Sequence, residues 1–300
     1  LVLSISIMSV ALAQDGADDL PGGGWFTGVQ IQNVGTGAAT VEIKSYDSKS
    51  TATFTSGTIS VAQDGSTTLL PDALGITGSD FQGSATASAN QPMRAIVNTT
   101  NLPIGSLGTA GGKAAGQYQG VNVPATSISF PLAKNNHFGK TTTFYIQNAG
   151  TTATTAQAEF KLGGGNCSLT TPSIEPNRMF VLNATAAGCP TGNDTGLGSL
   201  TVTAAEPLAG VVLEHGTTES PAVQLQATRG FAPADADTTV YAPIIKTEYF
   251  NRFTGLQIQN TTAAPIDVTV TYNGSSQSGS TCGGQTFTQS QTGLAAGASV

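Results

Sequence analysis

A tripeptide that returns at a nearly constant interval constrains this chain more than any other feature. Ile-Gln-Asn occurs at residues 31–33, 146–148 and 258–260 of 300, at spacings of 115 and 112 residues. A second landmark begins at Gly83 and returns at Gly198, again 115 residues later. Landmarks that recur in the same order at one period indicate tandem homologous modules. A period of this length is too long for a solenoid unit and suits a module with its own core.

The landmarks divide the chain into three expected modules. We expect the first over residues 14–117, a complete second over 118–235 and a third over 236–300. The third has Ile-Gln-Asn but no copy of the Gly83 landmark, so we expect it to be incomplete, with exposed core and sheet edge. The Gly/Ala-rich residues 103–117 are expected to form a mobile linker.

Within each module the pattern predicts β-strands. Val268, Val270 and Tyr272 alternate with polar residues, which is the period-two pattern of a half-buried strand. Pro207 is expected to separate one strand from the apolar run at 208–213. Because turn signals recur between about seven short apolar runs, and no long helical stripe is present, we predict an all-β chain of antiparallel Greek-key β-sandwiches.

The composition excludes several classes of protein. Eighteen acidic and 11 basic residues give a net charge of −7, while 44 Thr and 25 Ser provide most of the polarity. So few scattered cations do not make a nucleic-acid-binding surface. Few charged residues and many glycines also argue against coiled coils and helical bundles.

The first residues predict export. Residues 1–13 read LVLSISIMSVALA, an apolar run too short to span a bilayer that ends in an A-x-A cleavage pattern. We interpret them as the remnant of a signal peptide, with a buried first strand as the alternative. No other stretch is long and apolar enough to span a membrane, so we expect an extracellular or cell-surface protein.

The three cysteines fit an exported protein. Cys167 and Cys189 lie 22 residues apart in one module, and we expect them to form a disulfide rather than two free thiols or a metal site. Adding 115 to 167 gives 282, so Cys282 is interpreted as the third-module equivalent of Cys167. Its partner would then fall beyond residue 300, and we expect Cys282 to be unpaired within this chain.

A search for catalytic residues yields little. The two histidines are His137, in a loop, and His215, next to Glu214 on a predicted strand. Neighbours on a strand point to opposite faces, so that pair is not expected to act as a general base and its orienting acid. No nucleophile elbow, zinc-protease, phosphate-loop or dinucleotide motif is present. We therefore predict no catalytic residues, no cofactor and no enzyme activity.

Three further groups are weak binding candidates. Asp235 and Asp237 could bind Ca²⁺ between modules, because calcium takes clustered oxygen ligands. Asp15, Asp18 and Asp19 are equally weak and fit a solvated tail. Trp25 and Phe26 could stack on a sugar if exposed, although a place in the core is the favoured interpretation.

The segments Pro131–Gly139, Thr143–Gly150 and Gly198–Val212 together resemble tandem Ig-like modules of bacterial secreted and cell-surface proteins. The resemblance implies Ig-like β-sandwiches and an extracellular setting. Such modules serve as stalks, spacers, adhesive surfaces or accessory parts of large exoenzymes. No catalytic residues come with the resemblance, and a fold does not fix a function.

Three hypotheses follow, from different classes. The leading one is a non-enzymatic structural or adhesive repeat protein whose partners are surface polysaccharide or neighbouring modules and copies. The alternative is an accessory carbohydrate-binding or spacer region of a larger secreted hydrolase. The least favoured is that the modules are themselves enzymatic.

Overall fold

The computed structural model describes residues 20–21, 23–76, 81–105, 107–216, 224–247, 253–275 and 281–300. The predicted signal peptide and Asp15, Asp18 and Asp19 lie outside these residues. The described chain is all-β, with antiparallel sheets, and contains no helix long and apolar enough to cross a membrane. Its elements are β1 (Phe26–Asn33), β2 (Ala39–Asp47), β3 (Thr53–Thr55), β4 (Ile59–Val61), β5 (Ser66–Leu69), the 3-10 helix η1 (Pro71–Leu74), β6 (Gly83–Ala89), β7 (Met93–Thr100), β8 (Ala115–Gln119), β9 (Ala125–Lys134), β10 (Lys140–Asn148), β11 (Ala156–Leu162), β12 (Gly165–Thr170), β13 (Met179–Asn183), β14 (Leu197–Gly216), β15 (Leu225–Arg229), the 3-10 helix η2 (Pro233–Asp235), β16 (Ile266–Asn273) and β17 (Thr286–Leu294).

The first region, residues 20–120, contains two sheets. One has the order β5-β1-β7-β8, and in the other β2 pairs with β3, β4 and β6. Ile31 on β1 and Val41 and Ile43 on β2 are almost fully buried in one apolar cluster, which lies between the sheets. Side chains at alternate positions of β2 fill this core, as the period-two pattern requires.

The second region, residues 125–235, contains one seven-stranded sheet built around the long strand β14. The first half of β14 pairs with β11 and β9, and its second half pairs with β10 and β15. Its pairing with β9 shifts register between Thr203 and Leu208, around Pro207. Leu200 and Val202 from one half and Leu208 and Val212 from the other enter a single buried cluster. The strand therefore contributes to both layers around that core.

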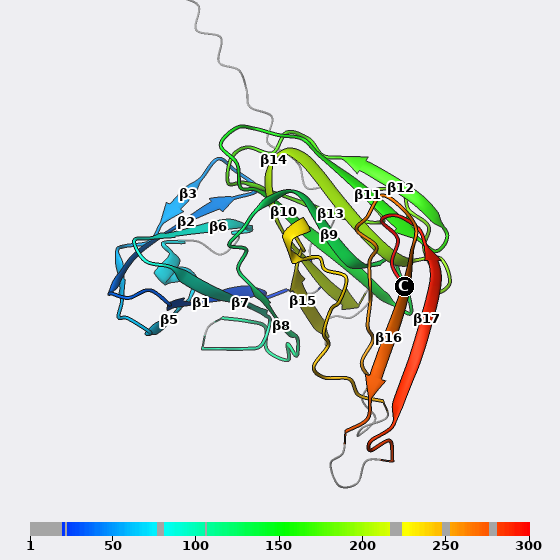
Figure 1. Cartoon of the computed structure of the whole chain (residues 1–300). Coiled ribbons are helices and arrows are strands. Elements are labelled where there is room, and N and C mark those ends of the chain that lie inside the picture. Colours follow the sequence, from blue (N-terminus) through cyan, green and yellow to red (C-terminus); the bar gives the residue numbers. More distant parts are fainter. Residues whose placement is uncertain are drawn as a thin grey trace, which may run out of the picture.

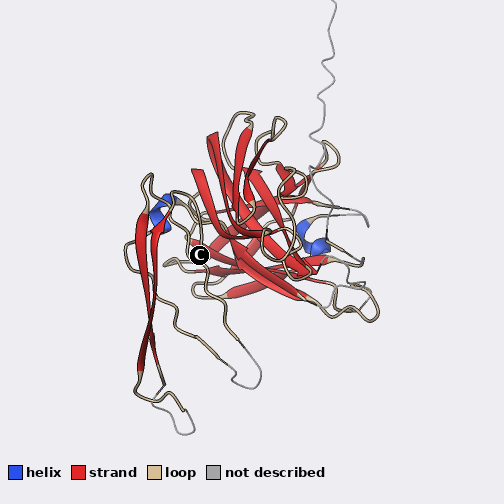
Figure 2. Cartoon of the chain, turned by 90° about the vertical axis from the view of Figure 1, so that its right-hand side faces the viewer, coloured by secondary structure: helices blue, strands red, loops and turns tan. Residues whose placement is uncertain are grey.

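In the third region, residues 240–300, the described residues form one hairpin. β16 pairs with β17, and Gln259 forms an isolated bridge with Ser299. Figure 1 shows the three regions in succession, from the blue first region through the green second to the orange and red hairpin. Figure 2 shows this hairpin as a two-stranded ribbon at one side of the molecule.

Several sequence predictions can be compared with these elements. The all-β class and the Cys167–Cys189 disulfide are confirmed, and the two Cα atoms lie 5.3 Å apart. The linker prediction for residues 103–117 is wrong at its end, because Ala114 is buried and β8 pairs with β7. The predicted boundary at residue 117 falls inside β8, and that at residue 235 falls at the end of η2.

Candidate functional site

The asparagine of each Ile-Gln-Asn copy holds the turn that follows it. All three asparagines are fully buried. In each, Oδ1 accepts from the N–H two residues on, and Nδ2 donates to the carbonyl four residues on and to a more distant carbonyl. The partners are Gly35, Gly37 and Val61 for Asn33 at 2.9, 2.7 and 3.1 Å, Gly150, Thr152 and Ile174 for Asn148 at 2.9, 2.8 and 2.8 Å, and Thr262, Ala264 and Leu294 for Asn260 at 2.9, 2.8 and 2.9 Å.

The glutamine before each of the later two asparagines faces the preceding region. Gln147 Nε2 donates to the carbonyl of Asn177, at 3.0 Å, and to Thr86 Oγ1, at 3.4 Å. Ser84 Oγ donates to the same Asn177 carbonyl, at 2.5 Å. Two side chains of β6, Ser84 and Thr86, therefore form hydrogen bonds with the Asn177 carbonyl and the Gln147 side chain. We call this contact the first junction.

The same contact occurs once more along the chain. Gln259 Nε2 donates to the carbonyl of Gly297, at 3.0 Å, and to Thr201 Oγ1, at 3.1 Å, while Ser199 Oγ donates to that carbonyl at 2.6 Å. Ser199 and Thr201 follow Gly198 as Ser84 and Thr86 follow Gly83. We call this contact the second junction. One chemical arrangement thus joins the first region to the second and the second to the third.

In each junction the residue whose carbonyl accepts these hydrogen bonds has a left-handed backbone conformation. Asn177 has a φ of 65° and Gly297 has a φ of 73°. Asp64, at the matching turn of the first region, has a φ of 59°. This conformation is accessible to glycine and tolerated by Asn and Asp, which explains the residue types at the three positions.

Each junction also contains a cation that donates to backbone carbonyls. The Arg178 guanidinium donates to the carbonyls of Asp47, Ser50 at 2.7 Å and Thr51 at 2.6 Å. In the second junction Lys161 Nζ donates to the carbonyl of Ala296, at 2.5 Å. Arg178 reaches back to the first region, whereas Lys161 reaches forward to the third. The cations therefore reinforce both junctions from the second region.

An apolar cluster completes the first junction. Leu20 and Ala114 of the first region are buried with Leu213 and Leu225 of the second. Trp25 is half-buried against this cluster, and its Nε1 donates to the carbonyl of Pro21 at 3.0 Å. Phe26 is half-buried at the start of β1. The two aromatic residues do not form an exposed stacking surface.

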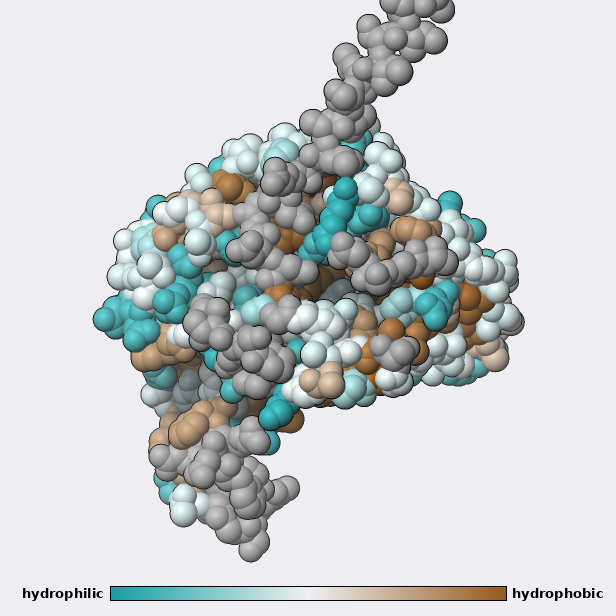
Figure 3. Space-filling view, turned by 180° about the vertical axis from the view of Figure 1, so that it is seen from behind, coloured by the Kyte–Doolittle hydropathy of each residue, from teal (hydrophilic) through white to brown (hydrophobic). Residues whose placement is uncertain are grey.

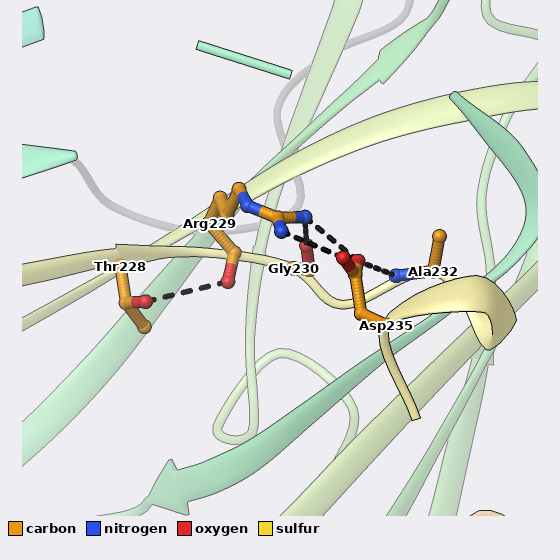
Figure 4. Close-up of polar contacts among 5 residues, drawn as sticks. All are labelled: Thr228, Arg229, Gly230, Ala232 and Asp235. Carbon is orange, nitrogen blue, oxygen red and sulfur yellow. Dashed lines mark hydrogen bonds and ion pairs between the residues drawn. The ribbon is translucent and has the colours of Figure 1, made fainter. Parts of the chain in front are cut away.

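The two calcium candidates have different surroundings. Both carboxylate oxygens of Asp235 accept from the Arg229 guanidinium, at 2.8 Å each, and Ala232 N–H donates to one of them (Figure 4). These hydrogen bonds, with that from Arg229 dominant, lower the pKa of Asp235, and the same contact raises the pKa of Arg229. Asp237 Oδ1 instead accepts from Thr238. The described residues contain no group of three or more His, Cys, Asp or Glu that could hold a metal ion.

The two histidines contact hydroxyl, backbone carbonyl and aromatic groups. His215 is buried, with Nε2 2.9 Å from Thr143 Oγ1 and Nδ1 2.9 Å from the carbonyl of Gly216. A carbonyl only accepts, so Nδ1 carries the proton. The adjacent Glu214 pairs with Lys134, at 2.9 Å. His137 stacks edge-on against Phe138 in a loop.

Cys282 does not occupy the position inferred from the period. Cys167 pairs across the sheet with Phe160, and the residue paired with the matching Tyr272 is Phe287. Cys282 lies exposed in the turn before β17. The difference arises because the turn between β16 and β17 is longer than that between β11 and β12.

Sequence reasoning found the repeated motifs but assigned them only to the fold. The residues that make the junctions are the Gln of Ile-Gln-Asn and the Ser and Thr that follow Gly83 and Gly198. The available signal was the return of polar residues at matching positions. The rest of the visible surface is mostly of intermediate hydropathy, as expected from its Thr and Ser content (Figure 3). In comparisons with known proteins, no family model and no curated sequence matches this chain.

Proposed function

We propose that this chain is a non-enzymatic extracellular structural protein. It is built from tandem Ig-like (Greek-key) β-sandwich modules over residues 14–117, 118–235 and 236–300. The junctions hold successive modules in one fixed relation, so that the chain acts as a stiff stalk or spacer. Adhesive contact with surface polysaccharide belongs to the same proposal.

The observation that carries this proposal is the recurrence of the junction. Ser84 and Thr86 meet Gln147 and Asn177 just as Ser199 and Thr201 meet Gln259 and Gly297. A contact that recurs in the same form favours a repeated mechanical role over a single binding event. The Cys167–Cys189 disulfide is compatible with an oxidising compartment outside the cytosol.

Small-angle X-ray scattering tests the stiffness of the chain. We expect the wild-type curve to fit one fixed arrangement of the three regions. Replacing Gln147 and Gln259 with alanine removes a donor from each junction and should lengthen the maximum dimension. Gln30→Ala, at an exposed position of β1, is the matched control. Equal curves for all three proteins would remove the mechanical role from the junctions.

Three further measurements test the hypotheses. Detergent-free fractionation of the producing cells should place the mature protein outside or on the cell surface, and a cytoplasmic location would contradict the proposal. Strong pull-down on insoluble polysaccharides would support a carbohydrate-binding role, which fits an adhesive surface as well as the accessory region of a secreted hydrolase. A hydrolase screen of the purified chain should stay blank.

A further inference from the structure

We infer that the open edge of β16 is an acceptor site for one extended polypeptide strand with the sequence pattern of β14. The inference goes beyond the structural role proposed above and depends only on strand pairing within this chain. It names a partner by its chemistry: a strand that begins with Gly-Ser and then carries apolar residues at alternate positions.

The inner face of β16 is less covered than the same face elsewhere. In β11, Ala156, Ala158 and Phe160 are all 0% exposed. Their counterparts at the same distance from Ile-Gln-Asn are Val268, Val270 and Tyr272 of β16, which are half-buried. The side chains on this face of β16 are larger than those of β11, yet they are less covered. The apolar surface left on β16 is what a further strand would bury.

The partner of β11 identifies what is missing beside β16. The first half of β14 pairs with β11 on one edge and with β9 on the other. In the first region β6, which shares the Gly-Ser start, pairs with β2 in the same register. Among the described residues β16 pairs with β17 alone. Two independent strand pairs therefore show which kind of strand occupies this position.

The counterpart of β9 is also uncovered in the third region. Ala133 of β9, which lies 13 residues before Ile146, is 0% exposed. Ile245 lies at the same distance before Ile258 and is 39% exposed, and its neighbour Ile244 is 67% exposed. Residues 242–246 form no strand. One incoming strand between β16 and this segment would cover both apolar surfaces, as β14 does between β11 and β9.

The corner that aligns this segment is already formed. In the second region the Lys134 N–H donates to Thr142 Oγ1, at 2.9 Å, and Thr142 Oγ1 donates to the Lys134 carbonyl, at 3.3 Å. In the third region Lys246 N–H donates to Thr254 Oγ1, at 3.0 Å, and Thr254 N–H donates to the Lys246 carbonyl at 2.9 Å. The segment is therefore anchored at the end where the incoming strand would begin.

The pairing predicts the register and the need for glycine. Gly198 pairs with Leu162, Leu200 with Phe160 and Val202 with Ala158. A Cβ on Gly198 would overlap the carbonyl of Lys161, and one on Gly83 would overlap that of Tyr46. We therefore expect the incoming glycine opposite Gly274, with its apolar residues opposite Tyr272 and Val270.

Hydrogen exchange with a synthetic peptide tests the site. The probe is the 20-residue peptide with the sequence of Leu197–Gly216, added in excess to the full chain. We expect amide exchange in residues 266–273 to slow at least roughly tenfold, with no change in β11. A peptide carrying Gly198→Val should not protect β16, and neither should a scrambled peptide.

Protein variants locate the contact. Val270→Asp on the inner face should abolish protection, whereas Thr271→Asp on the exposed face should keep it. Absence of protection by the wild-type peptide, or equal protection by the scrambled one, would overturn the inference. So would a dimer in sedimentation analysis with β16 protected before any peptide is added, because a second copy would then be the occupant.

Discussion

Three buried asparagines show how single residues hold this chain together. Each side chain satisfies three backbone groups across a turn and a neighbouring strand, so that removal leaves several groups without partners. A buried backbone group without a hydrogen bond is costly, because it has lost its bond to water as well. Because Gln147 and Gln259 directly precede two of these asparagines, the buried turns and the junctions lie in the same short segments of the chain.

Asn148→Ala should destabilise the second region by about 2–4 kcal/mol, since it removes the buried hydrogen bonds to the Gly150 N–H and to the carbonyls of Thr152 and Ile174. Urea unfolding followed by circular dichroism measures the change. Asn122→Ala is the control, because Asn122 is exposed and makes one 3.2 Å bond to the Met93 carbonyl. Equal midpoints for the two variants would contradict a structural role for Asn148.

Ser45 presents the opposite case. Its Oγ is buried and has no hydrogen-bond partner among the described residues, at the position that Phe160 occupies in the second region. Because the hydroxyl loses water without replacement, Ser45→Ala should stabilise the first region by about 1 kcal/mol. Thermal unfolding measures the gain, and Ser60→Ala, at an exposed position of β4, should change little.

At the scale of elements, a disulfide, an asparagine side chain and an ion pair hold the strands together, in addition to the hydrogen bonds between strands. The disulfide joins β12 to the loop after β13. Asn135 Nδ2 donates to the carbonyls of Cys189 and Pro190, at 3.0 and 3.1 Å, and so connects that loop to the end of β9. The Arg229–Asp235 ion pair connects the end of β15 to the end of η2.

Reduction of the disulfide should destabilise the second region by about 3 kcal/mol, because the bond limits the unfolded chain. Unfolding with and without dithiothreitol, followed by region-specific hydrogen exchange, measures this effect. The first region contains no cysteine and serves as the internal control. An equal loss in both regions would show that the reductant acts in some other way.

The Arg229–Asp235 pair should make the free energy of unfolding of the second region depend on pH in the acidic range. The hydrogen bonds from Arg229 lower the folded-state pKa of Asp235 below its ordinary value. Their contribution is present above the ordinary pKa, about 4, and is lost as pH falls through the lowered value. Asp235→Asn should therefore cost about 1 kcal/mol at neutral pH, with the difference from wild type disappearing in strong acid. Asp237→Asn is the control, and urea midpoints across pH provide the measurement.

The elements differ in how well the sequence predicts them. Alternation alone located β16, since Val268, Val270 and Tyr272 share one face. The expected break at Pro207 is not present, because β14 continues through it as one strand. Pro207 is tolerated there because the register shift with β9 leaves ladder bonds unmade. The junctions could not be predicted, because they depend on turns that bring Gln147 beside β6.

For the whole molecule, the junctions determine whether the regions unfold together. The first one combines the Ser84 and Thr86 contacts, the bonds from Arg178 and the apolar cluster around Leu213 and Leu225. Contacts of this extent couple the stability of two neighbouring regions, because unfolding of one removes the partners of the other.

Arg178→Ala should weaken this coupling, since it removes three bonds to the last residue of β2 and the loop that follows it. Differential scanning calorimetry should show one cooperative transition for the wild type and a lower-melting shoulder for the variant. Arg94→Ala, at an exposed position of β7, is the control. A variant trace that superimposes on the wild-type trace would show that Arg178 does not couple the regions.

The two sides of a junction are different surfaces, and this gives the molecule a direction. A contact between unlike patches is heterologous, so repeating it produces a polar series that does not close on itself unless the rotation between neighbours happens to complete a ring. The rotation at each junction is set by the same few side chains. A change at one of those positions, made in every copy, would therefore alter the pitch of the whole series while leaving each β-sandwich as it is.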